Sequence, residues 1–415
     1  MANQQEREAV RGHQEGAPLL SEAQVEEFLL HGVLVVDNVL SGEELRAARE
    51  GLSRTMTRHG IDVGRLDETG RALANLSSTN GSGGVLDVFY DPWKVAVATN
   101  PKLYRMTTQL WEAAYCHRGE SQEELDGSGE AFKWQPYGAF EPRKGYAYID
   151  RIGFRVPTKL GEKLGADSIS TEGELAAKQN VNAGTKNSSK SKMKKTKAVP
   201  IQRSLTPHLD CAPEDLFSST KKKWRPIQCF VSLTDNLEPN TGGFEAAKGF
   251  HRNFHSWAKD RPPTVVTRKV GKDKYETLSY PAPCIGEYTH IRPKEDCEVM
   301  AQVQHVPVPA GAAVFFDNRI PHANAYRHNG TEPRSVVYCS FLPDIPLNRE
   351  YASRQLDNWK RGRQPTDQWI EPENNQVQEE TIDEAGEDGA QSFQRYSSSL
   401  TQLQRRLLGI EPWDQ

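Results

Sequence analysis

The residues best suited to chemistry in this sequence are two histidines and an aspartate that could bind one metal ion. His208 and Asp210 stand two positions apart in the segment PHLD (207–210). Residues two apart on an extended strand point to the same face, so an imidazole and a carboxylate converge there. His322 follows the β-rich segment AAVFFDN (312–318). Two histidines and one carboxylate on one face of a metal leave three coordination positions open, an arrangement typical of iron(II) oxygenases.

An arginine extends this set. Arg334 comes twelve residues after His322 and opens the strand-like segment RSVVYCSFLP (334–343). Its planar guanidinium can pair bidentately with a carboxylate some distance from the metal. A His-x-Asp pair, or one histidine after a β-rich segment, is common by chance and is more often an ordinary surface or core feature. The ordered set of all four residues, each beside a strand-like segment, is far more specific and favours a metal site.

The elements predicted around these residues are mainly short strands. Residues 200–345 alternate between β-rich segments and turns rich in Gly, Pro and Asn, with no βαβ rhythm. Such a pattern favours an antiparallel sandwich or barrel. The strand-like segments are 225–235, 297–308, 312–318 and 334–343.

Helices are predicted mainly outside this region. Ser21 and Ser41 are placed to cap helices, and 400–408 carries leucines at helical spacing that indicate a final helix docking on the body. The remaining expectations are a strand at 32–40, a loop at 60–87, a helix near 101–115 and a strand at 146–156.

We expect one main domain with polar additions. The sequence predicts a flexible arm at residues 1–19 and a single domain at 20–357. A polar acidic linker with a C-terminal helix is predicted at 358–415. A mobile insertion is predicted at about 158–199, where KNSSKSKMKKTK (186–197) holds six lysines and no acid. A run of lysines like this is more often a solvated, mobile surface segment than a binding site for an anionic partner. The alternative that the segment is ordered and covers a cleft stays open.

Bulk composition excludes several classes of protein. Of 415 residues, 36% are hydrophobic and 26% charged, which indicates a soluble globular chain. The net charge of -4 gives no reason to expect nucleic acid or membranes as partners, and no apolar run approaches the roughly 18 residues that span a bilayer. The N-terminal segment lacks an apolar secretion core, so we predict a cytoplasmic protein. The six cysteines show no CxxC spacing and are expected to be thiols.

Three segments of the chain resemble the phytanoyl-CoA dioxygenase-like family of iron(II)- and 2-oxoglutarate-dependent oxygenases. The opening LLSEAQVEEFLLHGVLVVDNVLSGEELRAARE (19–50) is similar to the family's helix, strand and helix. The segment 227–251 resembles its central hairpin, and 308–338 its region of metal histidine and co-substrate arginine. The resemblance covers roughly 20–115 and 200–345, is patchy across 116–199 and is absent from the tail.

This resemblance implies a fold and an activity. The fold is mainly β, a double-stranded β-helix (a jelly-roll or cupin-like barrel) flanked by N-terminal and C-terminal α-helices. His208, Asp210 and His322 match the family's metal ligands, and Arg334 matches the anchor for 2-oxoglutarate. The implied reaction hydroxylates an unactivated C–H bond of a small organic substrate with Fe(II), 2-oxoglutarate and O2, releasing succinate and CO2, with ascorbate as reductant in vitro. Since halogenating relatives lose the carboxylate that Asp210 retains, hydroxylation is favoured over halogenation.

Three positions around the expected site call for separate expectations. Val231 stands where the family commonly has a tryptophan, which predicts a change in how 2-oxoglutarate is held. Arg151 and Arg155 are the candidates for an additional basic contact from an earlier strand. His251 matches a recurrent family histidine and is expected to make a turn-stabilising hydrogen bond rather than to bind metal.

Other readings of the same residues stay open. A cupin-type metal enzyme could use this scaffold without 2-oxoglutarate, although Arg334 is not expected in it. A non-catalytic binding module has no reason to keep all four residues. A nucleic-acid-modifying oxygenase is suggested only by the lysine run, which lacks interleaved aromatic residues. The sequence does not identify the substrate or the oligomeric state.

Overall fold

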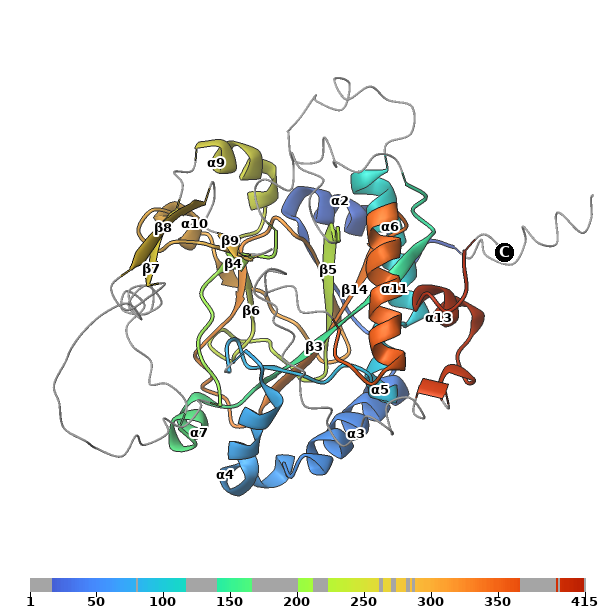
Figure 1. The fold of residues 1–415 in the computed structure, drawn as a ribbon, viewed down its shortest axis with the longest axis horizontal. Coiled ribbons are helices and arrows are strands. Elements are labelled where there is room, and N and C mark those ends of the chain that lie inside the picture. Colours follow the sequence, from blue (N-terminus) through green and yellow to red (C-terminus); the bar gives the residue numbers. More distant parts are fainter. Residues whose placement is uncertain are drawn as a thin grey trace, which may run out of the picture.

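Two six-stranded antiparallel sheets form the centre of the structure, with helices packed around them (Figure 1). The computed structural model describes residues 17–79, 81–116, 140–165, 201–211, 223–260, 264–269, 274–280, 284–285, 288–365, 393–394 and 396–413. In the first sheet the order is β1 (Val33–Val36), β12 (Ala313–Asp317), β5 (Ile227–Ser232), β14 (Arg334–Pro343), β3 (Gly145–Arg155) and β2 (Val85–Leu86). In the second it is β11 (Gln304–His305), β6 (Phe244–Ala246), β13 (His322–Asn324), β4 (His208–Leu209), β10 (Tyr288–His290) and β9 (Cys284–Ile285). A separate hairpin pairs β7 (Thr264–Lys269) with β8 (Tyr275–Tyr280).

The two sheets face each other through aromatic side chains. The ring of Phe244 in the second sheet lies 5.2 Å from that of Phe230 and 5.1 Å from that of Phe316, both in the first sheet. We call this side of the first sheet its inner face. Because alternate residues of a strand point to opposite sides, Val231 and Phe315 lie on the outer face, within the larger apolar core shared with the helices.

The helices cover mainly the outer face of the first sheet. Helix α5 contacts β14 and β3 there, while helix α11 and the short C-terminal helix α13 contact β3 (Figure 1). The helix bounds are α2 Glu22–His31, α3 Gly42–Arg58, α4 Leu66–Thr69, α5 Pro92–Ala98, α6 Pro101–Tyr115, α7 Thr158–Lys163, α9 Phe254–Asp260, α10 Cys297–Met300, α11 Pro346–Lys360 and α13 Gln402–Leu407. Short 3-10 turns occupy η1 Val63–Arg65, η2 Gly70–Leu76 and η6 Phe250–Asn253.

The helix caps agree with the sequence expectations. The side chains of Ser21 and Ser41 each accept a hydrogen bond from the backbone N–H three residues later. The side chain of that later residue accepts a second hydrogen bond from the backbone N–H of the serine. Thr401 caps α13 in the same way. Leu407 and Leu408 of this C-terminal segment are buried in the larger core, so the chain end is packed against the body.

Two predicted elements differ in the structure. The strand expected at 297–308 begins as helix α10, a single turn in which the backbone N–H of Met300 donates to the carbonyl of Asp296 and Val299 is buried in the apolar core. Strand pairing with β6 starts only at Gln304. The loop expected at 60–87 contains η1, α4 and η2, whose buried leucines Leu66 and Leu73 hold these turns on the core. Helix α5 was not predicted.

The structure confirms the predicted mainly antiparallel β-architecture with flanking helices, but not the closed barrel. The structure has two packed antiparallel sheets flanked by helices, and the described strands do not join into one closed barrel. Helix α7 occupies the start of the predicted insertion, whereas 166–199, including the lysine run, lies outside the described residues, as do 1–16 and 366–392. Cys229, Cys297 and Cys339 are thiols, as expected. Among the described helices, none combines the length and apolar character that a membrane crossing requires.

Candidate functional site

The structure brings His208, Asp210 and His322 together at one point. One ligand atom from each, two imidazole nitrogens and a carboxylate oxygen, lies within 4.8 Å of the others. The Nε2 of His208 is 3.5 Å from Oδ1 of Asp210, and the Nε2 of His322 is 3.7 Å from Oδ2. The two rings are 4.5 Å apart between centroids. The three residues selected from sequence spacing therefore converge as a ligand set would.

Neighbouring strands of the second sheet position the two histidines. His208 of β4 and His322 of β13 are direct partners in the antiparallel register, which places their side chains next to each other. His322 follows the turn that leaves β12, where the backbone N–H of Ile320 donates to the carbonyl of Asp317. The site thus depends on one strand pair and one tight turn.

Hydrogen bonds to backbone carbonyls fix the tautomer of both histidines. Nδ1 of His208 lies 3.0 Å from the carbonyl oxygen of Thr206, and Nδ1 of His322 lies 2.9 Å from that of Ile320. A carbonyl oxygen only accepts, so each Nδ1 carries the proton and Nε2 carries the lone pair. Partners of this kind orient histidine ligands in metal sites.

The protonation states suit a metal cation. Burial lowers the pKa of His208 to about 4 and also lowers that of His322, with Asp210 opposing the shift in both. Burial alone would raise the pKa of Asp210, but the two histidines and Arg225 outweigh it and hold this pKa below its ordinary value. Near neutral pH the set is two neutral imidazoles and one carboxylate.

The carboxylate also has an unsatisfied oxygen. Oδ1 of Asp210 is buried and accepts no hydrogen bond in the part of the chain that the structure describes. A buried carboxylate oxygen without a hydrogen bond is costly, because its desolvation is not offset by a donor. A cation held between this oxygen and the two Nε2 nitrogens would remove that cost, so the residues fit a divalent metal ion.

Arg225 is a neighbour of the site that sequence spacing did not single out. Its Nη2 lies 3.5 Å from Oδ2 of Asp210, and its Nη1 lies 3.4 Å from Oδ2 of Asp150. Its guanidinium also stacks over the ring of Tyr148 at 4.7 Å. The arginine therefore links the carboxylate of the site to strand β3.

Arg334 lies on the inner face of the first sheet and is connected to the histidine strand. Its Nη1 donates to Oδ1 of Asn324 at 2.8 Å, and Nδ2 of Asn324 donates to the hydroxyl of Tyr338 at 2.9 Å. Asn324 is two residues after His322 on β13, hence on the same face of that strand. The guanidinium stacks 5.6 Å above the ring of Phe230. Asn324 and Tyr338 were missed, although their even spacing from His322 and Arg334 was a usable signal.

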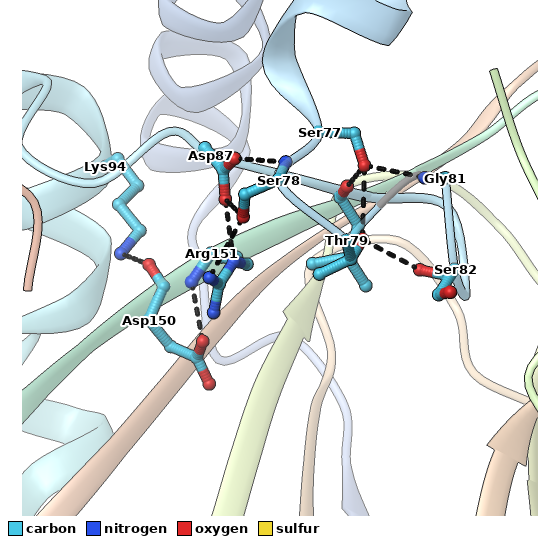
Figure 2. A network of polar contacts seen from close by, with 10 residues as sticks. Ser77, Ser78, Thr79, Gly81, Ser82, Asp87, Lys94, Asp150 and Arg151 are labelled. Atoms are coloured by element: carbon cyan, nitrogen blue, oxygen red, sulfur yellow. Dashed lines mark hydrogen bonds and ion pairs between the residues drawn. The ribbon is translucent and has the colours of Figure 1, made fainter. Parts of the chain in front are cut away.

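Of the two candidates for an extra basic contact, the structure places Arg155 beside Arg334. Arg155 and Arg334 are direct partners in the β3–β14 register, and both are almost fully buried. Arg151 instead forms an ion pair of 2.7 Å with Asp87 and donates to Ser78, within a polar network that also holds Lys94 and Asp150 (Figure 2). Arg151 is thus engaged elsewhere.

Two further expectations concern the direction of a side chain. The side chain of Val231 points into the outer core, on the face of the first sheet opposite Arg334, and the expectation that it changes how 2-oxoglutarate is held stays a prediction. His251 is fully buried, and its Nε2 donates to the carbonyl of Leu29 at 3.1 Å. It joins η6 to helix α2 and is no part of the metal set, as predicted.

Known structures share this fold at low sequence identity. The crystal structure of GlcNAc Inducible Gene 2, GIG2 (DUF1479), from Candida albicans matches with a TM-score of 0.59 and 15% identity, over 96% of this chain and 78% of that chain. The hypothetical protein JW0805 from Escherichia coli matches with a TM-score of 0.54 and 14% identity, over 94% of this chain and 82% of that chain. These two matches establish a common fold and no more.

A weaker match involves an enzyme of known cofactor class. The non-heme alpha ketoglutarate dependent carbocyclase SnoK from nogalamycin biosynthesis has a TM-score of 0.39 and 13% identity, over 79% of this chain and 87% of that chain. That TM-score is too low to support an inference about function. No protein-family model and no curated protein matches the sequence.

Proposed function

We propose that this chain is an Fe(II)- and 2-oxoglutarate-dependent dioxygenase of the phytanoyl-CoA dioxygenase-like type, built on a double-stranded β-helix. It would hydroxylate an unactivated C–H bond of a small organic substrate and release succinate and CO2. The observation that carries the proposal is the buried, unsatisfied Oδ1 of Asp210 facing two histidines whose Nε2 atoms hold lone pairs. Two histidines and one carboxylate are the donor set that iron(II) oxygenases use.

The chain's own residues would do the holding and the orienting. His208, Asp210 and His322 would bind the metal, and Arg334 would pair with the distal carboxylate of 2-oxoglutarate. When bound, the iron and the 2-oxoglutarate supply the oxidising chemistry, with O2 as the oxidant and ascorbate as reductant in vitro. Phe244 and Phe316 lie against the ring of His322, and Phe230 packs against Phe244; these apolar rings would help to exclude water from the metal site. Retention of Asp210 favours hydroxylation over halogenation.

Succinate formation tests the proposal directly. Purified protein supplied with Fe(II), ascorbate and 2-oxoglutarate should form succinate slowly even without its own substrate. His208→Ala should reduce this rate to that of the protein-free mixture, because a ligand to the metal is lost. His59→Ala changes an exposed histidine at the end of α3 and is the matched control. Equal rates for wild type and His208→Ala would refute the assignment.

The cupin-type reading makes a different prediction in the same experiment. An enzyme that binds iron without 2-oxoglutarate would still hold the metal through His208. Adding 2-oxoglutarate would change neither its metal binding nor its rate of succinate formation. The nucleic-acid reading relies on 186–197, which lies outside the described residues. No contact among the described residues favours it.

A further inference from the structure

The two carboxylate oxygens of Asp210 have different surroundings. Oδ2 forms an ion pair of 3.5 Å with Nη2 of Arg225 and lies 3.7 Å from Nε2 of His322. Oδ1 accepts no hydrogen bond from the described residues and lies 3.5 Å from Nε2 of His208. A carboxylate can bind a metal through one oxygen or through both. The group that occupies one oxygen therefore decides how many coordination positions the aspartate takes.

Arg225 is held firmly where it meets Asp210. The backbone N–H of Trp224 donates to Oδ1 of Asn348 at 2.8 Å, and the backbone carbonyl of Trp224 accepts from Nδ2 of Asn348 at 2.9 Å. The guanidinium of Arg225 stacks 4.7 Å above the buried ring of Tyr148. The chain before the arginine and the end of its side chain are thus both fixed, so that little freedom remains to be lost when the site is used.

The second carboxylate that Arg225 contacts belongs to a bulge in strand β3. Nη1 of Arg225 donates to Oδ2 of Asp150 at 3.4 Å. The register of β3 with β14 shifts at this point, so that Asp150 and Arg151 together lie opposite Tyr338. A bulge re-aims the side chains at its position. Here one of the two side chains reaches Arg225, whereas Arg151 pairs with Asp87.

A buried lysine holds the backbone of this bulge. Nζ of Lys94 donates to the backbone carbonyl of Asp150, and the backbone N–H of Arg151 donates to Oδ1 of Asp150 at 2.7 Å (Figure 2). Lys94 has no exposed surface. Burial lowers the pKa of Lys94 to about 8, with Asp150 opposing the shift, so the amine is still mostly an ammonium group at neutral pH. The place of Asp150 is therefore set by contacts other than that with Arg225.

We propose that Arg225 is a positioning residue that keeps Asp210 a one-oxygen ligand of the metal, and that Asp150 holds Arg225 in this role. The inference rests on the proposed function, because it concerns the coordination positions which that reaction needs. With Oδ2 paired to Arg225, only Oδ1 is offered to the cation, and three positions of an octahedral metal stay open. If both oxygens bound, only two positions would stay open, too few for a bidentate ligand together with a monodentate one.

The charge of Arg225 distinguishes this role from a purely structural one. A guanidinium beside Asp210 repels the cation that the carboxylate attracts. Loss of the guanidinium should therefore leave metal affinity unchanged or raise it, while one open position is lost. A residue that only stabilised the fold would instead lower metal affinity when it is replaced.

Co(II)-loaded protein tests the inference without turnover, because its visible absorption changes with each ligand that the metal gains. Acetohydroxamate serves as a bidentate probe. Imidazole serves as a monodentate probe that is neutral, so a lost protein charge does not itself weaken its binding. In wild type, imidazole should still bind when acetohydroxamate saturates the metal. In Arg225→Met, which keeps an apolar stem over Tyr148 but has no donor, the affinity for imidazole under these conditions should fall at least about tenfold. The affinity for Co(II) should not fall.

Two further variants and a control accompany this measurement. Arg225→Lys keeps the charge without the fork of donors, so it should recover part of the lost imidazole affinity. Asp150→Asn removes the carboxylate that holds Arg225 and should give a smaller loss in the same direction. Arg354→Gln changes an exposed arginine on α11 that lies 3.7 Å from Glu350, and it should bind both probes as wild type does.

The outcomes separate this inference from the proposed function. If Arg225→Met adds imidazole as readily as wild type does, the inference is overturned and the function stands. If Arg225→Met and Arg225→Lys both lose Co(II) affinity together with stability to urea, the arginine supports only the fold, and the inference is likewise overturned. A wild type that cannot bind Co(II), or that cannot add imidazole after acetohydroxamate, overturns both.

Discussion

At the scale of single residues, the donor chemistry of the site constrains what it can hold. His208 and His322 each commit Nδ1 to a backbone carbonyl, so their remaining nitrogens can only accept. Asp210 faces them with an oxygen that no described donor reaches. Three acceptors meeting without a proton between them suit a cation, whereas Arg334 and Arg155 present only donors and suit an anion. The described residues thus offer acceptors for a cation at one place and donors for an anion at another.

Arg334 gives the residue-scale prediction. Arg334→Gln removes a charge-assisted contact worth about 2–3 kcal/mol. The 2-oxoglutarate concentration needed for half-maximal succinate formation should therefore rise roughly 30- to 150-fold. Iron affinity, measured by titration of the metal-free protein, should stay at the wild-type value, because Arg334 contacts Asn324 rather than a ligand. A parallel loss of iron binding would contradict this separation of roles.

At the scale of elements, the turn between β12 and β13 determines where His322 lies. Asp317 accepts from Nε and Nη2 of Arg319, each at 2.7 Å, and from the hydroxyl of Tyr115 at 2.5 Å. Asp317 has no exposed surface, and burial and Arg319 have opposing effects on its pKa, with the net result that it is lowered. This buried ion pair ties the turn to helix α6 and so supports the histidine that follows.

Asp317→Asn should therefore damage both stability and the site. Removing one charge of a buried pair costs about 3–5 kcal/mol, because the other charge stays buried. Urea unfolding should show a lower free energy of unfolding, and the folded fraction should bind metal more weakly than wild type. Glu50→Gln breaks an exposed pair of 4.0 Å with Arg54 and should change neither quantity. A fully stable Asp317→Asn protein would show that the pair does not hold the turn.

The elements differ in how far the sequence alone could predict them. Strand β14 matches its predicted bounds, because Val336, Val337, Tyr338 and Phe341 all favour a strand and no helical period competes with them. Helix α10 was not predicted, because a helix of four residues is too short to show a helical period in the sequence. In the site, His208, Asp210 and His322 were found from local spacing. Arg225, Asn324 and Tyr338 were not, because their roles depend on strand pairings between distant segments.

At the scale of the whole molecule, segments far apart in the sequence pack against the same strand, β3. Trp413, near the C-terminus, donates from Nε1 to the carbonyl of Gly145 at the start of β3 at 2.9 Å, and Tyr104 of α6 packs against its ring at 5.9 Å. The other end of β3 carries Arg155. The strand that carries Arg155 is thus supported by residues from both the N-terminal and the C-terminal parts of the chain, which local sequence patterns could not reveal.

Buried histidines make the stability of the whole molecule depend on pH. Burial lowers the pKa of His251 to about 4, from an unfolded value near 6.5, with Asp317 opposing the shift. The unfolded chain binds this proton more readily than the folded one, so stability is present above pH 6.5 and is lost as pH falls toward 4. Between pH 7.5 and pH 5, where carboxyl groups hardly titrate, His251 alone should remove about 2 kcal/mol.

Urea unfolding of chelator-treated protein measures this loss. His251→Gln should be less stable than wild type at pH 7.5, because the hydrogen bond to Leu29 is altered, yet its stability should fall by about 2 kcal/mol less on going to pH 5. His59→Gln, at an exposed position, should follow the wild-type profile. His208 and His328, whose pKa values burial also lowers to about 4, should account for much of the slope that His251→Gln retains. Parallel profiles for wild type and His251→Gln would show that the His251 ring already accepts a proton in the folded state.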